Sequence, residues 1–236
     1  MTTMFDKLLQ LPLFQGISTD SLTTILDKVK LHFEKKFEGE VIVESGKSCD
    51  GLIFILHGEV EKTTIGMSEN PYEVSEFMTA PYLIEPSSLF GMTTDYKSTY
   101  TACCDVDIMS VSKESLKEVL LKNDIFQLNY LNMLCRRYQN LESRIWTLPS
   151  PNTTCLICEI IMSHFETTTG RKSLYINIED LAFKSNILRI QVKQILKKLE
   201  QQGLLQVNGR SINIPDASLL ADYSHSMVEG GLEDMS

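Results

Sequence analysis

The sequence predicts an α+β protein: an antiparallel β-barrel, then a long helix, then a small domain of helices and a β-hairpin. Three observations support this prediction. Residues 32–112 contain short β-rich runs separated by glycines, residues 118–149 follow a helical period, and residues 150–218 alternate between helical and strand patterns. A chain of 236 residues has room for one or two domains with cores of their own. We expect an N-terminal domain over 1–117, a dimerisation helix over 118–149, a C-terminal domain over 150–218 and an acidic flexible tail over 219–236.

The N-terminal domain is expected to begin with short helices, broken at Pro12 and Gly16, with Ser18 as a helix cap. Strand composition then follows in four runs: Val41–Val43, Leu52–Leu56, Val60–Ile65 and Val106–Val111. Glycines between these runs supply turn signals. Many short strands joined by turns are typical of an antiparallel barrel or sandwich.

The helical tract that follows carries a narrow apolar stripe. Ser112 is a candidate cap for its first turn. The stripe consists of Leu131, Leu134, Tyr138, Leu141, Ile145 and Leu148. Its alternating spacings of three and four average near the 3.5 of a heptad seam, which predicts a homodimer interface. Packing of the stripe against its own domain is the alternative. Pro149 and Pro151 end the helix and mark an interdomain hinge.

Residues 150–218 predict helices followed by a hairpin. A helical pattern over 154–165 and a short strand over 174–178 precede a helix that ends at a turn, Ser185-Asn186. A second helix over 187–202 is stopped by Gly203. Asn208-Gly209 then predicts a two-residue hairpin turn between alternating strands. Two helices, a turn between them and a hairpin constitute a winged helix-turn-helix.

Charge is distributed unevenly along the chain. The net charge of −9 argues against a nucleic-acid partner, but residues 150–218 hold 8 basic and 6 acidic side chains. Residues 184–198 include five basic side chains and no acidic one. Arginine can pair with guanine, glutamine with adenine, and lysine can neutralise phosphate. The candidate DNA contacts are Arg189, Gln191, Lys193, Gln194, Lys197, Lys184 and Arg210. An ordinary solvated basic face is the alternative.

Residues spread over nearly the whole chain resemble the Crp/Fnr family of transcriptional regulators. The resemblance rests on Leu181-Ala182, Arg189, Val192, Ile195-Leu196, Gly203-Leu204-Leu205 and Ile212 to Asp216, and on residues 11–18 and 50–60. It implies a cyclic-nucleotide-binding-like jelly-roll barrel and a homodimer that reads an inverted-repeat operator through helix 187–202. Double-stranded DNA and RNA polymerase are the partners that it implies.

The same resemblance implies roles along that helix. Arg189 and Gln194 become the base readers, with Gln191, Lys193 and Lys197 nearer phosphates. Leu188 replaces the serine that usually caps this helix, and Ile190 stands where an acidic reader is common. The operator is therefore expected to differ from the family's usual half-site.

Relatives that bind cyclic nucleotides hold the ribose with a Gly-Glu pair and the cyclic phosphate with an Arg-Ser pair. This chain has Glu85-Pro86 and Tyr96-Lys97 at those places. A lysine without the arginine fork is a weaker anion partner, which argues against cyclic AMP. We expect the barrel to sense an unknown small molecule or none. The candidate effector pocket consists of Glu85, Ser87, Ser88, Tyr96 and Lys97.

Other classes of site find little support. The six cysteines are scattered, which predicts buried thiols in a reducing compartment. Cys155 and Cys158 have redox-motif spacing but fit a packed helix face. We expect no metal and no cofactor. Catalytic motifs are missing, so we expect no enzyme. The chain has no signal-like N-terminus and no apolar run of membrane-spanning length, so we expect a cytoplasmic protein without a membrane partner. The alternative function is a small-molecule receptor or regulatory module that acts through a protein partner rather than DNA.

Overall fold

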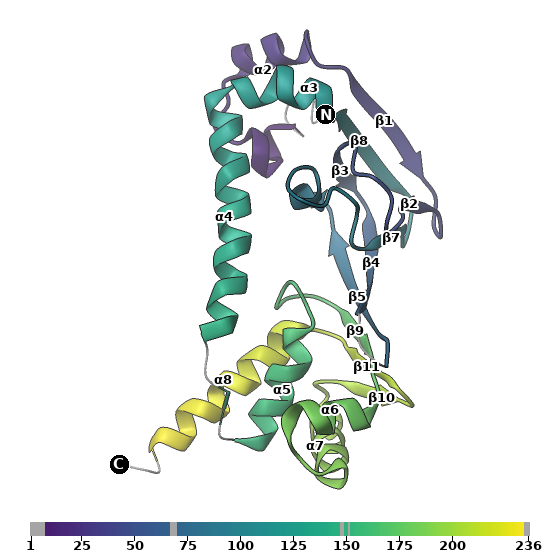
Figure 1. Ribbon diagram of the computed structural model, residues 1–236, viewed down its shortest axis with the longest axis vertical. Coiled ribbons are helices and arrows are strands. Elements are labelled where there is room, and N and C mark those ends of the chain that lie inside the picture. The colour runs from purple at the N-terminus through teal and green to yellow at the C-terminus, as the bar shows by residue number, and fades with distance from the viewer. Residues whose placement is uncertain (1–7, 67–69, 147–148, 151, 234–236) are drawn as a thin grey trace. The chain divides into compact units, whose positions relative to one another are not determined.

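The computed structural model describes residues 8–66, 70–146, 149–150 and 152–233 (Figure 1). The chain divides into two compact units. The first unit comprises Met1–Glu61 and Met78–Ile145, and the second comprises Lys62–Phe77 and Trp146–Ser236. Residues 62–77, which we expected within the N-terminal domain, therefore group with the C-terminal part of the chain.

The first unit contains short helical segments and one long helix. They are η1 (Pro12–Phe14), α2 (Thr19–Leu26), η2 (Pro86–Ser88), α3 (Lys113–Glu118), η3 (Leu120–Lys122) and α4 (Asp124–Trp146). The predicted caps are confirmed, because the hydroxyls of Ser18 and Ser112 accept hydrogen bonds from backbone amides three residues further on. The long helix was expected from residue 118 but begins at Asp124. The Asn123 side chain accepts a hydrogen bond from the Phe126 amide and so caps a separate helix there.

The first unit also contains antiparallel strands, and the four predicted runs lie in β2, β3, β4 and β8. The strands are β1 (Leu31–Lys36), β2 (Val41–Val43), β3 (Gly51–His57), β4 (Glu59–Gly66), β5 (Tyr72–Thr79), β6 (Tyr82–Ile84), β7 (Thr99–Ala102) and β8 (Val106–Ser112). β4 and β5 continue into the second unit. The strands of this unit belong to two sheets: one has the order β1-β8-β3-β6, and in the other β7 lies between β4 and β2. Within the described ranges both sheets are open, rather than the closed barrel that we expected. After β1 the chain turns at Gly39, and β2 pairs with β7 instead of extending the sheet beside β1.

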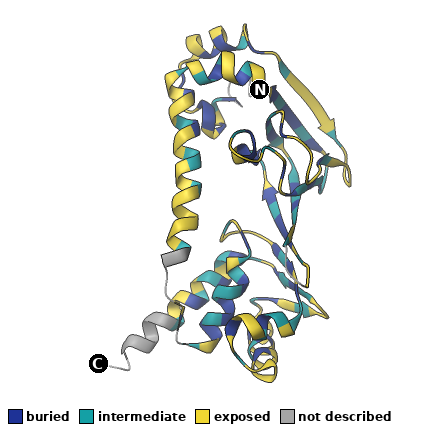
Figure 2. Cartoon of the chain, in the orientation of Figure 1, coloured by how far each residue is buried: buried dark blue, intermediate teal, exposed yellow. Residues whose placement is uncertain are grey.

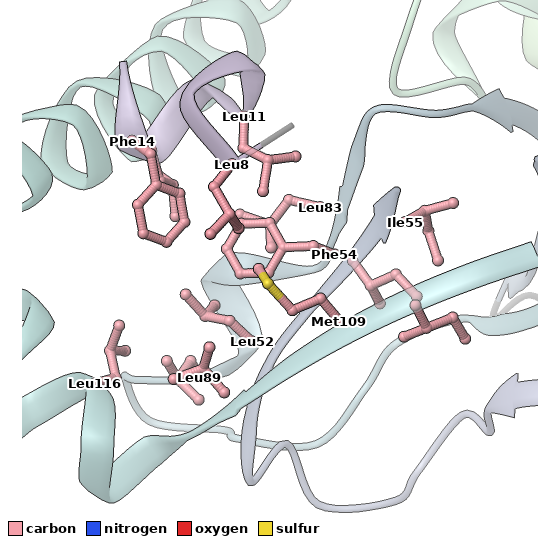
Figure 3. Packing of buried hydrophobic residues seen from close by; sticks show 14 of the residues in the cluster. Leu8, Leu11, Phe14, Leu52, Phe54, Ile55, Leu83, Leu89, Met109 and Leu116 are labelled. Carbon is pink, nitrogen blue, oxygen red and sulfur yellow. The ribbon is translucent and has the colours of Figure 1, made fainter. Parts of the chain in front are cut away.

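The core of the first unit joins this sheet to the helical segments (Figure 3). Leu52 and Phe54 alternate along β3 and are fully buried. The Phe14 ring lies 5.9 Å from the Phe54 ring and 5.2 Å from that of Phe126, measured between centroids. The start of α4 is thereby fixed to the strands by aromatic packing.

The second unit combines helices with a small sheet. Its elements are α5 (Thr153–Ser163), β9 (Lys172–Tyr175), α6 (Ile178–Ser185), α7 (Arg189–Gln201), β10 (Gln206–Asn208), β11 (Ser211–Ile214) and α8 (Ala217–Glu233). The strand order is β10-β11-β9-β5-β4, of which β4 belongs to this unit from Lys62 onward. The Asn152 side chain caps α5, whereas Pro151 of the expected hinge lies outside the described residues. α6 and α7 meet at Asn186, whose left-handed conformation ends α6.

Three expectations for this unit need correction. The strand expected over 174–178 ends at Tyr175, because Asn177 is already the N-cap of α6. The hairpin turn is Gly209-Arg210 rather than Asn208-Gly209, since Asn208 pairs with Ser211. The tail expected to be flexible from residue 219 instead forms α8, because Ala217 and Leu220 are fully buried against the core.

The cysteines only partly follow the prediction of buried thiols. Cys49, Cys155 and Cys158 are buried, Cys103 and Cys104 are half-buried, and Cys135 is exposed. Burial raises the pKa of Cys158 to about 12, so this thiol stays protonated at neutral pH. No helix in the described part of the chain has the length and apolar character needed to cross a membrane.

A buried ion network links the segment 62–77 to the rest of the second unit. The segment's β5 pairs antiparallel with β9. The Glu76 carboxylate, 2% exposed, lies 2.9 Å from Lys172 Nζ and 3.4 Å from Lys62 Nζ, and Lys62 also pairs with Glu166. Burial by itself would raise the pKa of Glu76, but the two lysines and the Thr167 amide lower it overall. The carboxylate is therefore charged and fully compensated at neutral pH.

Replacing Glu76 with alanine should destabilise the second unit by about 3–5 kcal/mol, because two buried lysines lose their shared partner. Urea unfolding of the wild type and of Glu76→Ala measures this difference. Glu73→Gln on the same strand removes an exposed carboxylate and should change stability by less than about 1 kcal/mol. Equal effects of the two substitutions would contradict the central role of Glu76.

The lowered pKa of Glu76 also sets the direction of the pH dependence. The contribution of Glu76 to the free energy of unfolding is fully present above the carboxyl's ordinary pKa. It is lost as the pH falls through the lowered pKa of the folded protein. Wild-type stability should therefore fall in acid more steeply than that of Glu76→Ala. Parallel pH profiles for the two proteins would exclude this contribution.

Candidate functional site

α7 presents a polar face opposite a buried one. Its inner side is formed by Val192, Leu196 and Leu199, all buried. The five predicted contacts on this helix are all exposed: Arg189, Gln191, Lys193, Gln194 and Lys197. Ile190, Lys198, Glu200 and Gln201 are exposed as well. The predicted contacts lie on the side away from the core because residues three and four positions apart on a helix share a face. The structure thus brings together cationic and amide side chains on one solvent-facing surface.

Arg189, at the start of this face, is engaged by a neighbouring carboxylate. Its Nη1 lies 2.9 Å from Oε1 of Glu179 on α6. Both side chains are more than half exposed, at 57% and 56%, so the pair is weak and easily exchanged for another anion. Leu188 and Ile190 flank Arg189 and are 72% and 70% exposed.

The two remaining predicted DNA contacts lie on other elements and contact aromatic rings. Lys184 Nζ on α6 lies 4.7 Å from the centre of the Tyr72 ring and 2.8 Å from Nε2 of His164. Burial, and next the charge of Lys184, lower the pKa of His164, so the ring is neutral at pH 7 and its Nε2 can accept a hydrogen bond from the Lys184 ammonium group. The guanidinium of Arg210, in the hairpin turn, lies 5.0 Å from the centre of the Tyr175 ring.

α4 exposes much of its predicted apolar stripe (Figure 2). Leu131, Tyr138 and Leu141 are 50%, 65% and 57% exposed. Leu134 is half-buried and packs partly on the first unit's core. Ile145 lies within α4, and Leu148 lies outside the described residues. The helix therefore carries one apolar face on its own unit and several large apolar side chains in solvent.

The predicted effector residues do not form one pocket. Glu85, Ser88 and the backbone of Lys97 come together: the Glu85 carboxylate accepts hydrogen bonds from the Ser88 hydroxyl at 3.0 Å and the Lys97 amide at 2.8 Å. Ser87 is exposed and stands apart from this cluster. The sequence prediction missed Ser98, whose amide is the third donor, at 2.9 Å. The available signal was Glu85 itself, because the resemblance implied a glycine at this position and a buried carboxylate needs hydrogen-bond donors.

Tyr96 belongs to a different environment. It lines a cavity of about 480 Å³ in the first unit, together with residues that include His32, Val43, Lys47, Asp50, Ile53 and Ser110. Burial, and next a hydrogen bond with Cys49, raise the pKa of Tyr96. The tyrosine is therefore neutral and cannot replace an arginine as an anion partner. Glu85, Ser87, Ser88 and Lys97 do not line this cavity.

The segment that begins at Glu85 also contacts α4. The Tyr130 hydroxyl donates to the Pro86 carbonyl at 2.7 Å, and the Tyr130 and Phe90 rings meet edge to face. Burial raises the pKa of Tyr130 to about 12, so its proton stays available for this bond. The sequence prediction also missed Tyr130, because the helical spacing of apolar residues indicates only that this position lies in the core.

Known proteins share one domain of this chain. Residues 34–123 match the model of the cyclic nucleotide-binding domain family. The potassium channel KOR2 of Oryza sativa subsp. japonica is 29% identical over 119 residues, which are 50% of this chain and 16% of the channel. KOR1 of the same plant is 36% identical over 81 residues, 34% of this chain and 8% of the channel. The chain thus matches only a small part of these relatives.

Solved structures align over most of the chain. The catabolite activator protein of Thermus thermophilus is 15% identical with a TM-score of 0.47, and the alignment covers 91% of this chain and 99% of that one. DNR from Pseudomonas aeruginosa is 19% identical with a TM-score of 0.46, covering 94% and 97%. The predicted resemblance is confirmed for the cyclic nucleotide-binding domain at residues 34–123.

Proposed function

We propose that this protein is a DNA-binding transcriptional regulator of the Crp/Fnr type. In this proposal α6, α7 and the β10–β11 hairpin form a winged helix-turn-helix, and the first unit is a sensor or regulatory domain. The observation that carries it is the exposed face of α7, where cationic and amide side chains occur without a carboxylate over residues 189–199. We further propose that the protein acts in the cytoplasm with RNA polymerase as a partner and has no catalytic role.

The α7 face has the chemistry for reading a major groove. An arginine can donate two hydrogen bonds to guanine and a glutamine can pair with adenine, while lysines meet phosphates. We assign the first two roles to Arg189 and Gln194, and the third to Lys193 and Lys197. Exposed Ile190 suits a thymine methyl group, which is an apolar contact. DNA would replace Glu179 as the partner of Arg189.

The exposed stripe on α4 supports a homodimer. Apolar side chains spaced by three and four residues pack well against a second copy of the same helix. A two-fold dimer places its recognition helices about 34 Å apart, one turn of DNA, and reads an inverted repeat. The stripe would then set the spacing of the two recognition helices.

A regulatory module that binds a protein partner is the second candidate. Three large apolar side chains near the α6–α7 turn favour it: Phe183, Leu188 and Ile190 are 89%, 72% and 70% exposed. Exposed apolar groups of this size commonly mark protein contacts.

Selection of bound duplexes from a random DNA pool separates the two candidates. The purified chain is mixed with the pool, and light scattering after size exclusion gives the mass of the same sample. Enrichment of an inverted repeat by a dimer would support the regulator. A folded dimer that enriches no sequence would favour the protein-partner module.

Two substitutions on α7 should have distinguishable effects on the selected operator. Arg189→Ala should cost about 1–3 kcal/mol in binding free energy and relax specificity at one base position. Lys197→Ala should weaken binding to all sequences and reduce the salt slope by about one. Fluorescence anisotropy against matched operator variants at several salt concentrations measures both. An equal loss on every sequence from Arg189→Ala would contradict its role as a reader.

Charges introduced into the stripe should separate the protomers. Leu131→Asp combined with Leu141→Asp places like charges at a seam that excludes water, so light scattering should report a monomer. Asn132→Asp with Gln139→Asp adds the same charge at exposed positions outside the stripe and should leave the dimer intact. If the dimer survives Leu131→Asp with Leu141→Asp but is lost in Asn132→Asp with Gln139→Asp, the interface lies outside the stripe.

A further inference from the structure

A carboxylate without a cationic partner is buried in the first unit. Glu85 is 5% exposed, and both of its carboxylate oxygens accept hydrogen bonds. Oε1 accepts from the Ser98 amide at 2.9 Å, and Oε2 accepts from the Lys97 amide at 2.8 Å and the Ser88 hydroxyl at 3.0 Å. Over the described ranges no lysine, arginine or histidine forms an ion pair with it. Three donors therefore converge on one charge.

The backbone at Glu85 is strained. Its φ is 29°, in the region that favours glycine, and Asn186 is the other described non-glycine residue with positive φ. Such a conformation is unfavourable in a residue with a side chain and persists where the surroundings enforce it. Here the hydrogen bonds of the carboxylate are the compensating interaction. A glycine would relieve the strain but would supply no anion.

The donors have the form of an anion-binding site. Successive backbone amides that point to one spot create a concavity with positive potential, which binds phosphate or carboxylate groups. The amides of Lys97 and Ser98 are successive, and Ser88 adds a buried hydroxyl from η2. An acceptor with two oxygens satisfies all three donors, as an anionic ligand would.

We propose that Glu85 is a built-in anion that occupies this site in place of a diffusible one. The side chain is equivalent to a propionate tethered to the backbone, so its effective concentration at the amides is high and free anions are excluded. The carboxylate consequently satisfies these donors without a carboxylate or phosphate effector at residues 97–98. This inference concerns the first unit alone and stands whether or not the second unit binds DNA.

Removal of the side chain should expose the site to small anions. Glu85→Gly relieves the positive φ and leaves a cavity the size of propionate beside the three donors. We expect its melting temperature to fall by roughly 5–15 °C, because several charge-assisted hydrogen bonds are lost. Sodium propionate should then raise the melting temperature saturably, since a ligand that binds only the folded state stabilises it. The wild type should show no saturable rise.

Matched controls isolate the anion effect. Sodium chloride at equal ionic strength and neutral propionamide should stabilise Glu85→Gly less than propionate does. Glu85→Gln keeps the volume filled, so propionate should not stabilise it even though the charge is gone. Glu38→Ala removes an exposed carboxylate of the same unit and should behave as the wild type. If Glu85→Gly is unfolded alone, recovery of its near-ultraviolet circular dichroism during a propionate titration replaces the melting temperature.

Two results would overturn the proposal. One is an equal response of Glu85→Gly to propionate, propionamide and chloride, which would show that the amides do not form an anion site. The other is saturable stabilisation of the wild type by propionate, inorganic phosphate or cyclic AMP that is lost in Ser88→Ala. That result would show the site open to diffusible anions while Glu85 is present.

Discussion

Compensation of buried charge is the constraint on which much of this structure depends. Glu76 and Glu85 are carboxylates that lie almost entirely out of water. A buried charge is tolerated only where hydrogen bonds or opposite charges replace its hydration. Each glutamate therefore contacts partners from distant parts of the sequence. These contacts hold segments whose conformation local propensity alone would not determine. Glu76 joins the 62–77 segment to β9, and Glu85 joins η2 to the chain before β7.

The two glutamates are compensated in chemically different ways. Lys62 and Lys172 surround Glu76 with opposite charge, and both lysines are themselves buried, so the cluster is complete only with all its members. Neutral amides and a hydroxyl surround Glu85. Removal of Glu76 leaves the buried Lys172 without its carboxylate partner and Lys62 with Glu166 alone, which is a stability defect. Removal of Glu85 leaves uncharged donors that another anion can satisfy. For this reason only the second arrangement has the character of a binding site.

Local patterns predicted much of the fold. The strand runs of β2, β3, β4 and β8 and the caps at Ser18 and Ser112 follow from composition and from side-chain chemistry within a few residues. The exposed face of α7 follows from its helical period. What could not be predicted depends on distant contacts: β5 pairs with β9 about 100 residues later, and α8 is helical where Leu220 is buried against the core. At Glu85 the resemblance indicated a pocket residue, but only the positions of the Lys97 and Ser98 amides show that the carboxylate fills the site itself.

Helix α4 links the Glu85 site to the stripe proposed for dimerisation. Tyr130, on its buried face, donates to the carbonyl of Pro86, the residue after Glu85. Leu131 begins the exposed stripe one position later and points to solvent. A change in the 85–98 segment would therefore reach α4 through Tyr130. If Glu85 holds that segment permanently, the helix is held as well, and an effector acting on the first unit must bind elsewhere. The cavity that Tyr96 lines does not include Glu85, Ser88 or Lys97 among its lining residues.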